Sequence, residues 1–351
     1  MKSIEIGDTK IGPSEPPFII AEMSANHNGD IENAKKIILS AKNEGADAVK
    51  IQTYKPDTIT LNSKSEDFMI NDGGLWDGRS LFDLYEEAHM PWDWHKPLFD
   101  FSDSIGLTIF SSPFDKTAVD LLEDLNTPAY KIASFEIIDL PLIKYVAATK
   151  KPMIISTGMA NQDEILEALE AARNGGCDDI ALLHCVSSYP AKPSDYNLKT
   201  IADMQKTFKV NVGISDHTIS NTTALTSIAF GGCIIEKHFT LDRSGGGPDD
   251  TFSLEPSELN DLCINSKIAW NAIGEINYSL KEAEVPNIKF RRSLYFINDI
   301  KKGEKVTDSD IASVRPGYGI PPKNFDLIIG KRVTKDILKN TAVKFSDISD
   351  L

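Results

Sequence analysis

Two histidines, His217 and His238, stand at the ends of two consecutive apolar segments that are rich in β-branched residues. If these segments are neighbouring parallel strands, they lie about 4.8 Å apart and the two imidazoles come to one level. Such a pair, completed by water, leaves positions open for a substrate oxygen on a divalent metal ion that acts as a Lewis acid. The pair therefore predicts a metal site, and two hydrogen-bonded structural histidines are the alternative.

Two lysines, Lys50 and Lys131, also lie in or at the ends of apolar segments, where packing alone would favour Val, Ile or Leu. Five serines occupy similar positions and add hydroxyl groups: Ser112, Ser134, Ser156, Ser187 and Ser215. A lysine is a point charge that suits phosphate, so the set predicts a site for a small phosphorylated or carboxylated anion. Any single serine could instead cap the helix that follows its strand.

Two glutamates, Glu22 and Glu136, are candidates for acid and base catalysis, because a carboxyl group near a metal and lysines can hold or pass a proton. A structural ion pair with Lys50 or Lys131 is the alternative. Alternation places Lys131 and Glu136 on opposite faces of a regular strand. That strand must therefore end between them if both residues act in one site.

Three further polar residues lie near these strand ends. Gln52 shares a strand with Lys50, and Tyr189 follows the sixth apolar segment. The segment from Leu241 to Glu255 contains three consecutive glycines, and we expect it to be a mobile flap over the site. Its Asp249 could reach a sugar hydroxyl, and plain solvent exposure is the alternative.

The elements that must position these residues alternate along the chain. Eight short apolar runs predict strands: Phe18 to Met23, Ala48 to Thr53, Leu107 to Ser112, Ala129 to Ser134, Met153 to Thr157, Ile180 to Val186, Val210 to His217 and Cys233 to Thr240. Amphipathic helical patterns lie between them. Strands joined through helices pair in parallel, so the pattern predicts an α/β fold, a closed (β/α)₈ TIM barrel with its site at the carboxyl ends of the strands. A doubly wound open sheet is the alternative, but no strand is followed by the GxGxxG pattern of dinucleotide-binding sheets.

The chain divides into a large and a small unit. We expect a barrel domain over 1–282, a charged linker over 283–292 and a small C-terminal module over 293–351. A module of that size is marginally stable alone, so docking onto a barrel, its own or a partner's, would supply burial.

The composition is that of an ordinary globular protein. Fifty-two acidic and 37 basic residues give a net charge of −15, which argues against a polycation that holds nucleic acid. No apolar run approaches the roughly 18 residues of a membrane helix, and the start lacks a signal-peptide core. We therefore expect a soluble, cytoplasmic protein that binds neither nucleic acid nor membrane. Its four cysteines are too few and too separated for a disulfide scaffold, so buried free thiols are expected.

Taken in order, these residues resemble the sialic acid synthase family, which condenses phosphoenolpyruvate with an amino sugar. The resemblance rests on Ala21-Glu22 with Asn26-His27, on 50–53 (KIQT), 110–114 (FSSPF), 129–134 (AYKIAS), 156–159 (STGM), 215–218 (SDHT), 236–239 (EKHF) and 314–317 (VRPG). It implies that the C-terminal module is an antifreeze-like (SAF) domain that packs over the barrel of a partner subunit. The functional unit would then be a domain-swapped homodimer, with Arg315 entering the neighbouring site to contact the sugar.

The same resemblance implies a role for each candidate. Phosphoenolpyruvate would be held by Lys50, Ser112, Lys131, Ser134, Ser156, Ser187 and Ser215. The sugar would contact Gln52, Tyr189, Asp249 and Arg315, and His217 and His238 would bind Mn²⁺, Mg²⁺ or Co²⁺. For the addition of water at C2, we expect Glu22, Glu136 or a metal-bound base to take the proton.

Within the family, the segments 51–57 (IQTYKPD), 73–78 (GGLWDG), 84–88 (LYEEA) and 292–295 (RSLY) look most like the pseudaminic acid synthases. That branch uses 2,4-diacetamido-2,4,6-trideoxy-L-altrose. His184 departs from this branch and is similar to the N-acetylneuraminate synthases. The alternatives are therefore an N-acetylneuraminate or legionaminate synthase, a metal-dependent aldolase or isomerase, and a non-enzymatic protein whose C-terminal module binds ice or glycan.

Overall fold

The computed structural model describes residues 2–71 and 73–349 and divides the chain into two units, Met1–Gly274 and Glu275–Leu351. This division falls eight residues before the expected end of the barrel domain at 282. The segment expected to be a charged linker, 283–292, lies mostly within an exposed 3₁₀ helix, η5 (Glu282–Phe290). A proline within a charged, aperiodic stretch hides such a helix from a search for hydrophobic periodicity.

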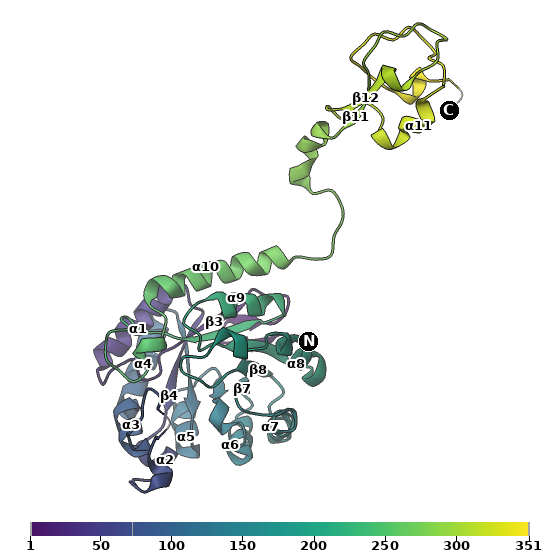
Figure 1. Ribbon diagram of the computed structural model, residues 1–351. Coiled ribbons are helices and arrows are strands. Elements are labelled where there is room, and N and C mark those ends of the chain that lie inside the picture. Colours follow the sequence, from purple (N-terminus) through teal and green to yellow (C-terminus); the bar gives the residue numbers. More distant parts are fainter. Residues whose placement is uncertain (1, 72, 350–351) are drawn as a thin grey trace. The chain divides into compact units, whose positions relative to one another are not determined.

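The larger unit is a closed barrel of eight parallel strands in the order β10-β3-β4-β5-β6-β7-β8-β9 (Figure 1). The strands are β3 (Phe18–Glu22), β4 (Ala48–Thr53), β5 (Thr108–Pro113), β6 (Tyr130–Ile132), β7 (Met153–Ser156), β8 (Ile180–Cys185), β9 (Asn211–Ser215) and β10 (Ile234–His238). All eight coincide with the predicted segments, so the predicted TIM barrel is confirmed and the open sheet is wrong.

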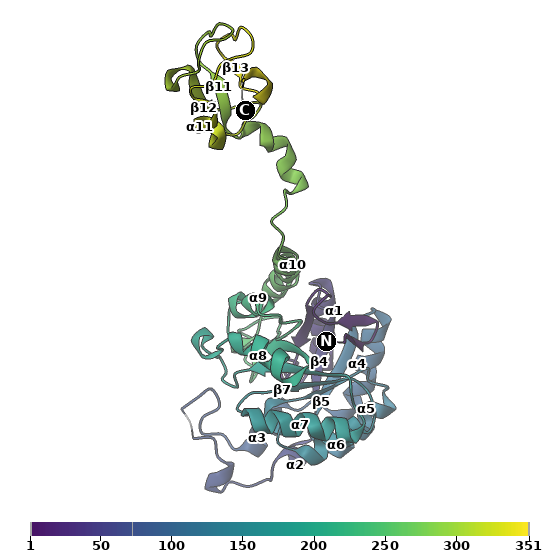
Figure 2. The same cartoon turned by 90° about the vertical axis from the view of Figure 1, so that its right-hand side faces the viewer.

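Helices surround the barrel in both views (Figures 1 and 2). They are α1 (Ile31–Asn43), α2 (Pro56–Ile59), α3 (Leu81–Ala88), α4 (Trp92–Ser104), α5 (Lys116–Asp124), α6 (Leu140–Ala147), α7 (Gln162–Gly175), α8 (Lys199–Phe208), α9 (Thr222–Ala229) and α10 (Pro256–Ile273). Single 3₁₀ turns are η1 (Glu66–Phe68), η2 (Ser134–Glu136), η3 (Pro193–Asp195) and η4 (Asp250–Phe252). Side-chain caps start several helices, as where Asn161 accepts from the backbone of α7.

The barrel interior determines which side chains reach the site. A cluster inside the strands contains Ile20, Ala48, Phe110, Ala129, Ile154, Leu183 and Ile234. Because side chains alternate across a strand, the residue two positions further along faces the same interior. Those residues are Glu22, Lys50, Ser112, Lys131, Ser156, Cys185 and Glu236. The apolar plug of the barrel therefore ends in a polar layer at the carboxyl ends of its strands.

The opposite end of the barrel is closed by a hairpin of β1 (Ile4–Ile6) and β2 (Thr9–Ile11), whose isoleucines join the interior cluster. The outward residues of the strands pack against the helices in a larger second cluster. All four cysteines are buried and free, as predicted. Within the described part of the chain, no helix combines the length and apolar character that crossing a membrane requires.

The smaller unit has a core of its own around Leu294, Phe296 and Val343. A three-stranded antiparallel sheet joins β11 (Ser293–Phe296), β12 (Ile311–Val314) and β13 (Thr341–Ala342). Its short helices are α11 (Phe325–Ile328), η6 (Asp308–Asp310), η7 (Pro322–Asn324) and η8 (Phe345–Asp347).

Candidate active site

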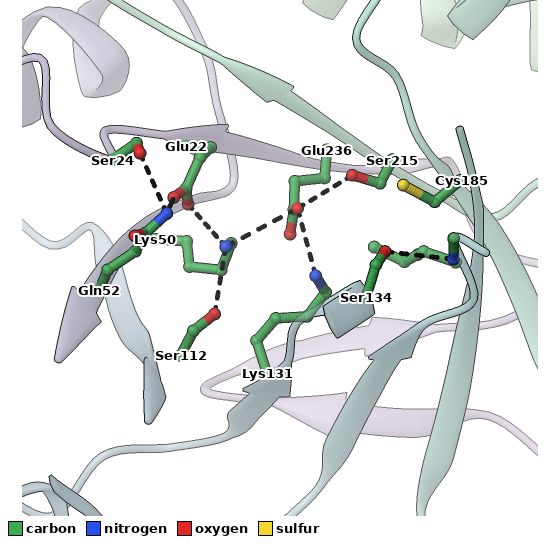
Figure 3. A network of polar contacts seen from close by, with 12 residues as sticks. Glu22, Ser24, Lys50, Gln52, Ser112, Lys131, Ser134, Cys185, Ser215 and Glu236 are labelled. Carbon is green, nitrogen blue, oxygen red and sulfur yellow. Dashed lines mark hydrogen bonds and ion pairs between the residues drawn. The ribbon is translucent and has the colours of Figure 1, made fainter. Parts of the chain in front are cut away.

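The polar layer contains four buried ionic side chains, Glu22, Lys50, Lys131 and Glu236, here called the inner ion cluster (Figure 3). Lys50 Nζ lies 2.8 Å from Glu22 Oε2 and 3.7 Å from Glu236 Oε1. Lys131 Nζ lies 3.3 Å from the same Glu236 oxygen. None of the four side chains is more than 5% exposed, so each charge depends on the others for compensation.

Burial and pairing shift the pKa values of this cluster in different directions. Burial opposes ionisation of Glu236, but Lys131 and Lys50 outweigh it and lower the pKa of that carboxyl. Burial and the neighbouring Glu236 charge raise the pKa of Glu22, although Lys50 acts against them. Burial lowers the pKa of Lys131, whereas the two glutamates raise that of Lys50 despite its burial. Glu22 is therefore the carboxyl of the cluster that takes up a proton more readily.

Hydroxyl groups surround the two lysines. Ser112 Oγ accepts a hydrogen bond from Lys50 at 3.2 Å, and Ser215 Oγ donates one to Glu236 at 3.2 Å. Ser156 Oγ is buried without a hydrogen-bond partner among the described residues. A buried unpaired hydroxyl is costly, which indicates a group ready for a ligand oxygen.

Two more predicted serines meet at Gly158. Its backbone N–H donates to Ser134 Oγ at 3.1 Å. A Cβ at Gly158 would lie 2.2 Å from Ser187 Oγ and 2.7 Å from Ser134 Oγ, so only glycine leaves the backbone open between them. The structure thus brings all seven predicted anion-binding residues to the carboxyl ends of the strands.

The two catalytic candidates differ in their surroundings. Glu22 makes an ion pair with Lys50, which is the structural alternative to a catalytic role. Gln52 Nε2 donates a hydrogen bond to Glu22 Oε1 at 2.9 Å. Glu136 lies in η2, after β6 has ended at Ile132, so the strand ends between Lys131 and Glu136 as required. Burial raises the pKa of Glu136 to about 7, and its Oε2 has no partner among the described residues.

The two histidines lie together, with ring centroids 5.4 Å apart at 61°. His217 Nδ1 lies 2.8 Å from the Val186 carbonyl oxygen, which orients Nε2 away from that strand. His238 Nδ1 is buried and unpartnered in the described residues. Burial lowers the pKa of His238 well below its usual value, and the charges of His217 and the lysines add to this.

This pair fits a divalent cation as an open site. Neutral imidazole is the form that binds metal, and the orphaned His238 nitrogen has a free lone pair or proton to satisfy. Among the residues that the structure describes, no third His, Cys, Asp or Glu completes a ligand set with them. Water and substrate oxygens would have to supply the remaining positions.

A buried pair on the outer side of the barrel fixes the end of β9. Lys237 Nζ lies 2.9 Å from Asp216 Oδ2 and donates to the carbonyl oxygen of Thr218 at 2.6 Å. Tyr196 OH donates to the Ser215 carbonyl at 3.0 Å and accepts from the His217 N–H at 2.8 Å. These bonds hold the turn that carries His217.

The segment expected to be a mobile flap is anchored. Asp250 accepts hydrogen bonds from Thr240 Oγ1 at 2.5 Å and Asn28 Nδ2 at 3.0 Å. Asp249 is buried and accepts from Ser24 Oγ, so the alternative of solvent exposure is wrong. Glycine content suggested mobility, but the acidic side chains of this loop pair with residues that follow β3 and β10.

Tyr189 also lies at the site, with its ring centroid 4.4 Å from that of His217. Arg315 is an exposed residue of the smaller unit, and its predicted contact with the sugar stays a prediction.

Sequence reasoning gave no role to Glu236, Cys185 or the pair of Lys237 and Asp216. Glu236 could have been found, because it precedes His238 by two residues and so shares its face of the strand. Cys185 Sγ lies 3.9 Å from His217 Nδ1, a contact created by the pairing of β8 with β9.

A closed parallel barrel with convergent lysines, carboxylates and imidazoles at its carboxyl end defines an enzyme-type site for a small anionic substrate. Comparison with known proteins gives the family: residues 37–278 match the NeuB family and residues 291–349 match the SAF domain. The chain belongs to the NeuB family, and the predicted resemblance to sialic acid synthases is confirmed.

Curated relatives include a pseudaminic acid synthase of Campylobacter jejuni, 44% identical over 94% of this chain and 96% of its own. A Helicobacter pylori pseudaminic acid synthase is 42% identical over 95% and 98%. An N,N'-diacetyllegionaminic acid synthase of Legionella pneumophila is 34% identical over 96% of both chains. Among solved structures, an N-acetylneuraminic acid synthetase of Leptospira borgpetersenii is 30% identical with a TM-score of 0.73, over 83% of this chain and 96% of its own.

Replacing Lys237 by Met should destabilise the protein by about 3–5 kcal/mol, because it leaves Asp216 as a buried, unpaired charge. The measurement is the free energy of unfolding in urea. Lys96→Met is the matched control, since Lys96 pairs with Asp100 on the surface, where such pairs contribute about 0–1 kcal/mol. An equal loss of unfolding free energy in the two variants would contradict a stabilising buried ion pair between Lys237 and Asp216.

Replacing Glu136 by Gln should stabilise the protein at pH 8 and change little near pH 4. A folded-state pKa of about 7 against a usual 4.5 means that unfolding releases a proton between these values, so wild-type stability falls as pH rises through this window. Glutamine removes that penalty, giving a gain of about 1–3 kcal/mol above pH 7. Urea unfolding of both proteins at several pH values measures it, and a difference that does not vary with pH would refute it.

Proposed function

We propose that this chain is a pseudaminic acid synthase. It condenses phosphoenolpyruvate with 2,4-diacetamido-2,4,6-trideoxy-L-altrose and water to give pseudaminic acid and phosphate. The observation that carries the proposal is the inner ion cluster with its ring of hydroxyls, in a chain 42–44% identical to curated pseudaminic acid synthases.

The phosphate of phosphoenolpyruvate binds Lys50 and Lys131, with Ser112, Ser134, Ser156, Ser187 and Ser215 donating hydroxyl hydrogen bonds. Without substrate, two lysines balance two glutamates in the inner ion cluster. An anion added to this buried, balanced set favours proton uptake by a carboxyl group. Glu22 takes that proton, because its pKa is already raised.

Carbon C3 of phosphoenolpyruvate attacks the aldehyde carbon of the open-chain sugar, and positive character develops at C2. Glu136 deprotonates the water that adds at C2, since Glu22 already carries a proton, and a pKa of about 7 lets Glu136 accept and return a proton near neutral pH. The tetrahedral intermediate then breaks its C–O bond, and phosphate leaves with the bridging oxygen. Positioning and charge stabilisation supply most of the acceleration, and no covalent nucleophile is needed.

His217 and His238 would hold a divalent ion such as Mn²⁺, Mg²⁺ or Co²⁺. When bound there, the ion supplies Lewis-acid polarisation of the aldehyde oxygen. The Val186 carbonyl fixes the ring orientation of His217, and His238 is the last residue of β10.

On the acceptor side, Gln52, Tyr189 and Asp249 contact the sugar. The SAF match supports a domain-swapped homodimer in which Arg315 of one protomer reaches the site of its partner. We place the enzyme in the cytoplasm, where phosphoenolpyruvate is made.

Phosphoenolpyruvate labelled with ¹⁸O at the bridging oxygen should transfer the label to inorganic phosphate, because the C–O bond breaks. Mass spectrometry of phosphate and of the nine-carbon product measures this with three competing acceptors: the diacetamido-trideoxy-altrose, N-acetylmannosamine and the legionaminate precursor. Lys131→Met should lower kcat/KM by at least about 100-fold, because it removes one of the two ammonium groups that bind the phosphate. Preference for another acceptor, or turnover without phosphoenolpyruvate, would contradict the proposal.

Complete chelation should abolish turnover, and added Mn²⁺ should restore it. His238→Ala should weaken Mn²⁺ binding, measured calorimetrically, by about 10-fold or more, because it removes one of two protein ligands. His89→Ala is the control, since His89 lies outside the site on the insertion after β4. Turnover that survives chelation would overturn the metal assignment and leave the remaining site unaffected.

A further inference from the structure

Three aromatic side chains, Trp76, Tyr189 and Phe252, form a continuous group that we call the aromatic wall. The ring centroids of Trp76 and Tyr189 are 5.8 Å apart, and those of Tyr189 and Phe252 are 5.3 Å apart. Tyr189 contacts His217 at 4.4 Å, and Phe252 contacts His238 at 5.0 Å. The wall therefore begins at the imidazole pair and continues outward to Trp76.

The site is layered along the barrel axis. Glu236 faces the interior two residues before His238, so the carboxyl group that contacts both lysines lies one layer deeper along β10 than the His238 imidazole. The aromatic wall comes from the loops beyond the strand ends: Trp76 from the insertion after β4, Tyr189 from the loop after β8, and Phe252 from η4. The site therefore has charged groups in the barrel interior and aromatic faces in the loops beyond the strand ends.

Trp76 has a fixed position in this wall. Its indole Nε1 donates to the Pro248 carbonyl oxygen at 3.1 Å, which ties the insertion after β4 to the loop between β10 and α10. Its ring is half-buried. A partly exposed indole beside a half-buried tyrosine is a surface on which apolar groups of a ligand gain contact.

We propose that the aromatic wall is an apolar subsite for the methyl-bearing groups of the acceptor sugar and that Trp76 is a specificity-determining residue. This inference rests on the proposed function. With the aldehyde at the imidazole pair, the rest of the open sugar chain extends along the wall. A 2,4-diacetamido-2,4,6-trideoxy sugar presents a second acetamido methyl and a C6 methyl there, whereas N-acetylmannosamine presents hydroxyl groups.

The physical basis is the free-energy cost of burying a hydroxyl group against an apolar surface without a hydrogen-bond partner. Aromatic faces offer a hydroxyl group no strong hydrogen-bond partner, so a sugar hydroxyl against the wall loses water without replacement. One methyl-sized difference in an apolar pocket changes selectivity by about 10- to 200-fold. Phosphoenolpyruvate lies on the inner ion cluster and does not contact Trp76.

The test compares kcat/KM of wild type, Trp76→Ala and Trp76→Phe for the two sugars. Trp76→Ala should lower the ratio of the diacetamido sugar to N-acetylmannosamine by about 10- to 100-fold, with KM for phosphoenolpyruvate within twofold of wild type. Trp76→Phe keeps an aromatic face but loses the bond to Pro248, so its ratio should fall by less than about threefold. Trp92→Phe, on the same insertion beneath Lys55, is the matched control and should keep the wild-type ratio.

An equal loss of kcat/KM for both sugars in Trp76→Ala would overturn the inference. A selectivity ratio in Trp76→Phe as low as that in Trp76→Ala would also overturn it, because the hydrogen bond to Pro248, and not the aromatic face, would then set the selectivity. The wild-type protein separates the two proposals. If wild type makes no product from the diacetamido sugar, the proposed function fails; if it does and the variants keep its ratio, only the aromatic wall fails.

Discussion

The compensation of buried charge in the inner ion cluster is the constraint on which the site depends. Two ammonium groups and two carboxylates lie together at the end of an apolar barrel interior, and none is more than 5% exposed. Removing one partner from such a set typically costs about 3–5 kcal/mol, so the cluster persists only as a balanced unit. In the proposed function, an anionic substrate would disturb that balance, so phosphate binding by the lysines would be coupled to proton uptake by Glu22.

The barrel meets this constraint through alternation. Residues that plug the interior, such as Ile20 and Ile234, are followed two positions later by Glu22 and Glu236, and the register of β3 and β10 pairs Glu236 with Ile20 and His238 with Glu22. The neighbouring residues whose side chains face outward stabilise the scaffold. Lys237 and Asp216 pair outside the barrel and hold the turn of His217, so adjacent residues in one strand serve the chemistry and the scaffold separately.

The sequence predicted much of this arrangement because strand polarity and period are local properties. The eight strands and the parallel barrel are confirmed by the structure, and the family by the comparisons. The candidate anion-binding residues lie at the carboxyl ends of the strands, and their role stays a prediction. The expectation that the structure corrects concerns a segment whose partners are distant. The loop from Leu241 to Glu255, expected to be a mobile flap, is anchored by residues such as Asn28. No local pattern encodes such contacts.

The sequence by itself determined the order of the elements, the faces of the strands and the kinds of chemistry available, because composition and a period of two residues suffice for these. Only the tertiary structure decided which charges pair. Lys131 and Glu236 are 105 positions apart and meet because the barrel closes. The same closure sets Tyr189 between Trp76 and the imidazoles. The pKa of a carboxyl group such as Glu136 follows from its burial, which is a property of the folded chain and not of its neighbours in sequence.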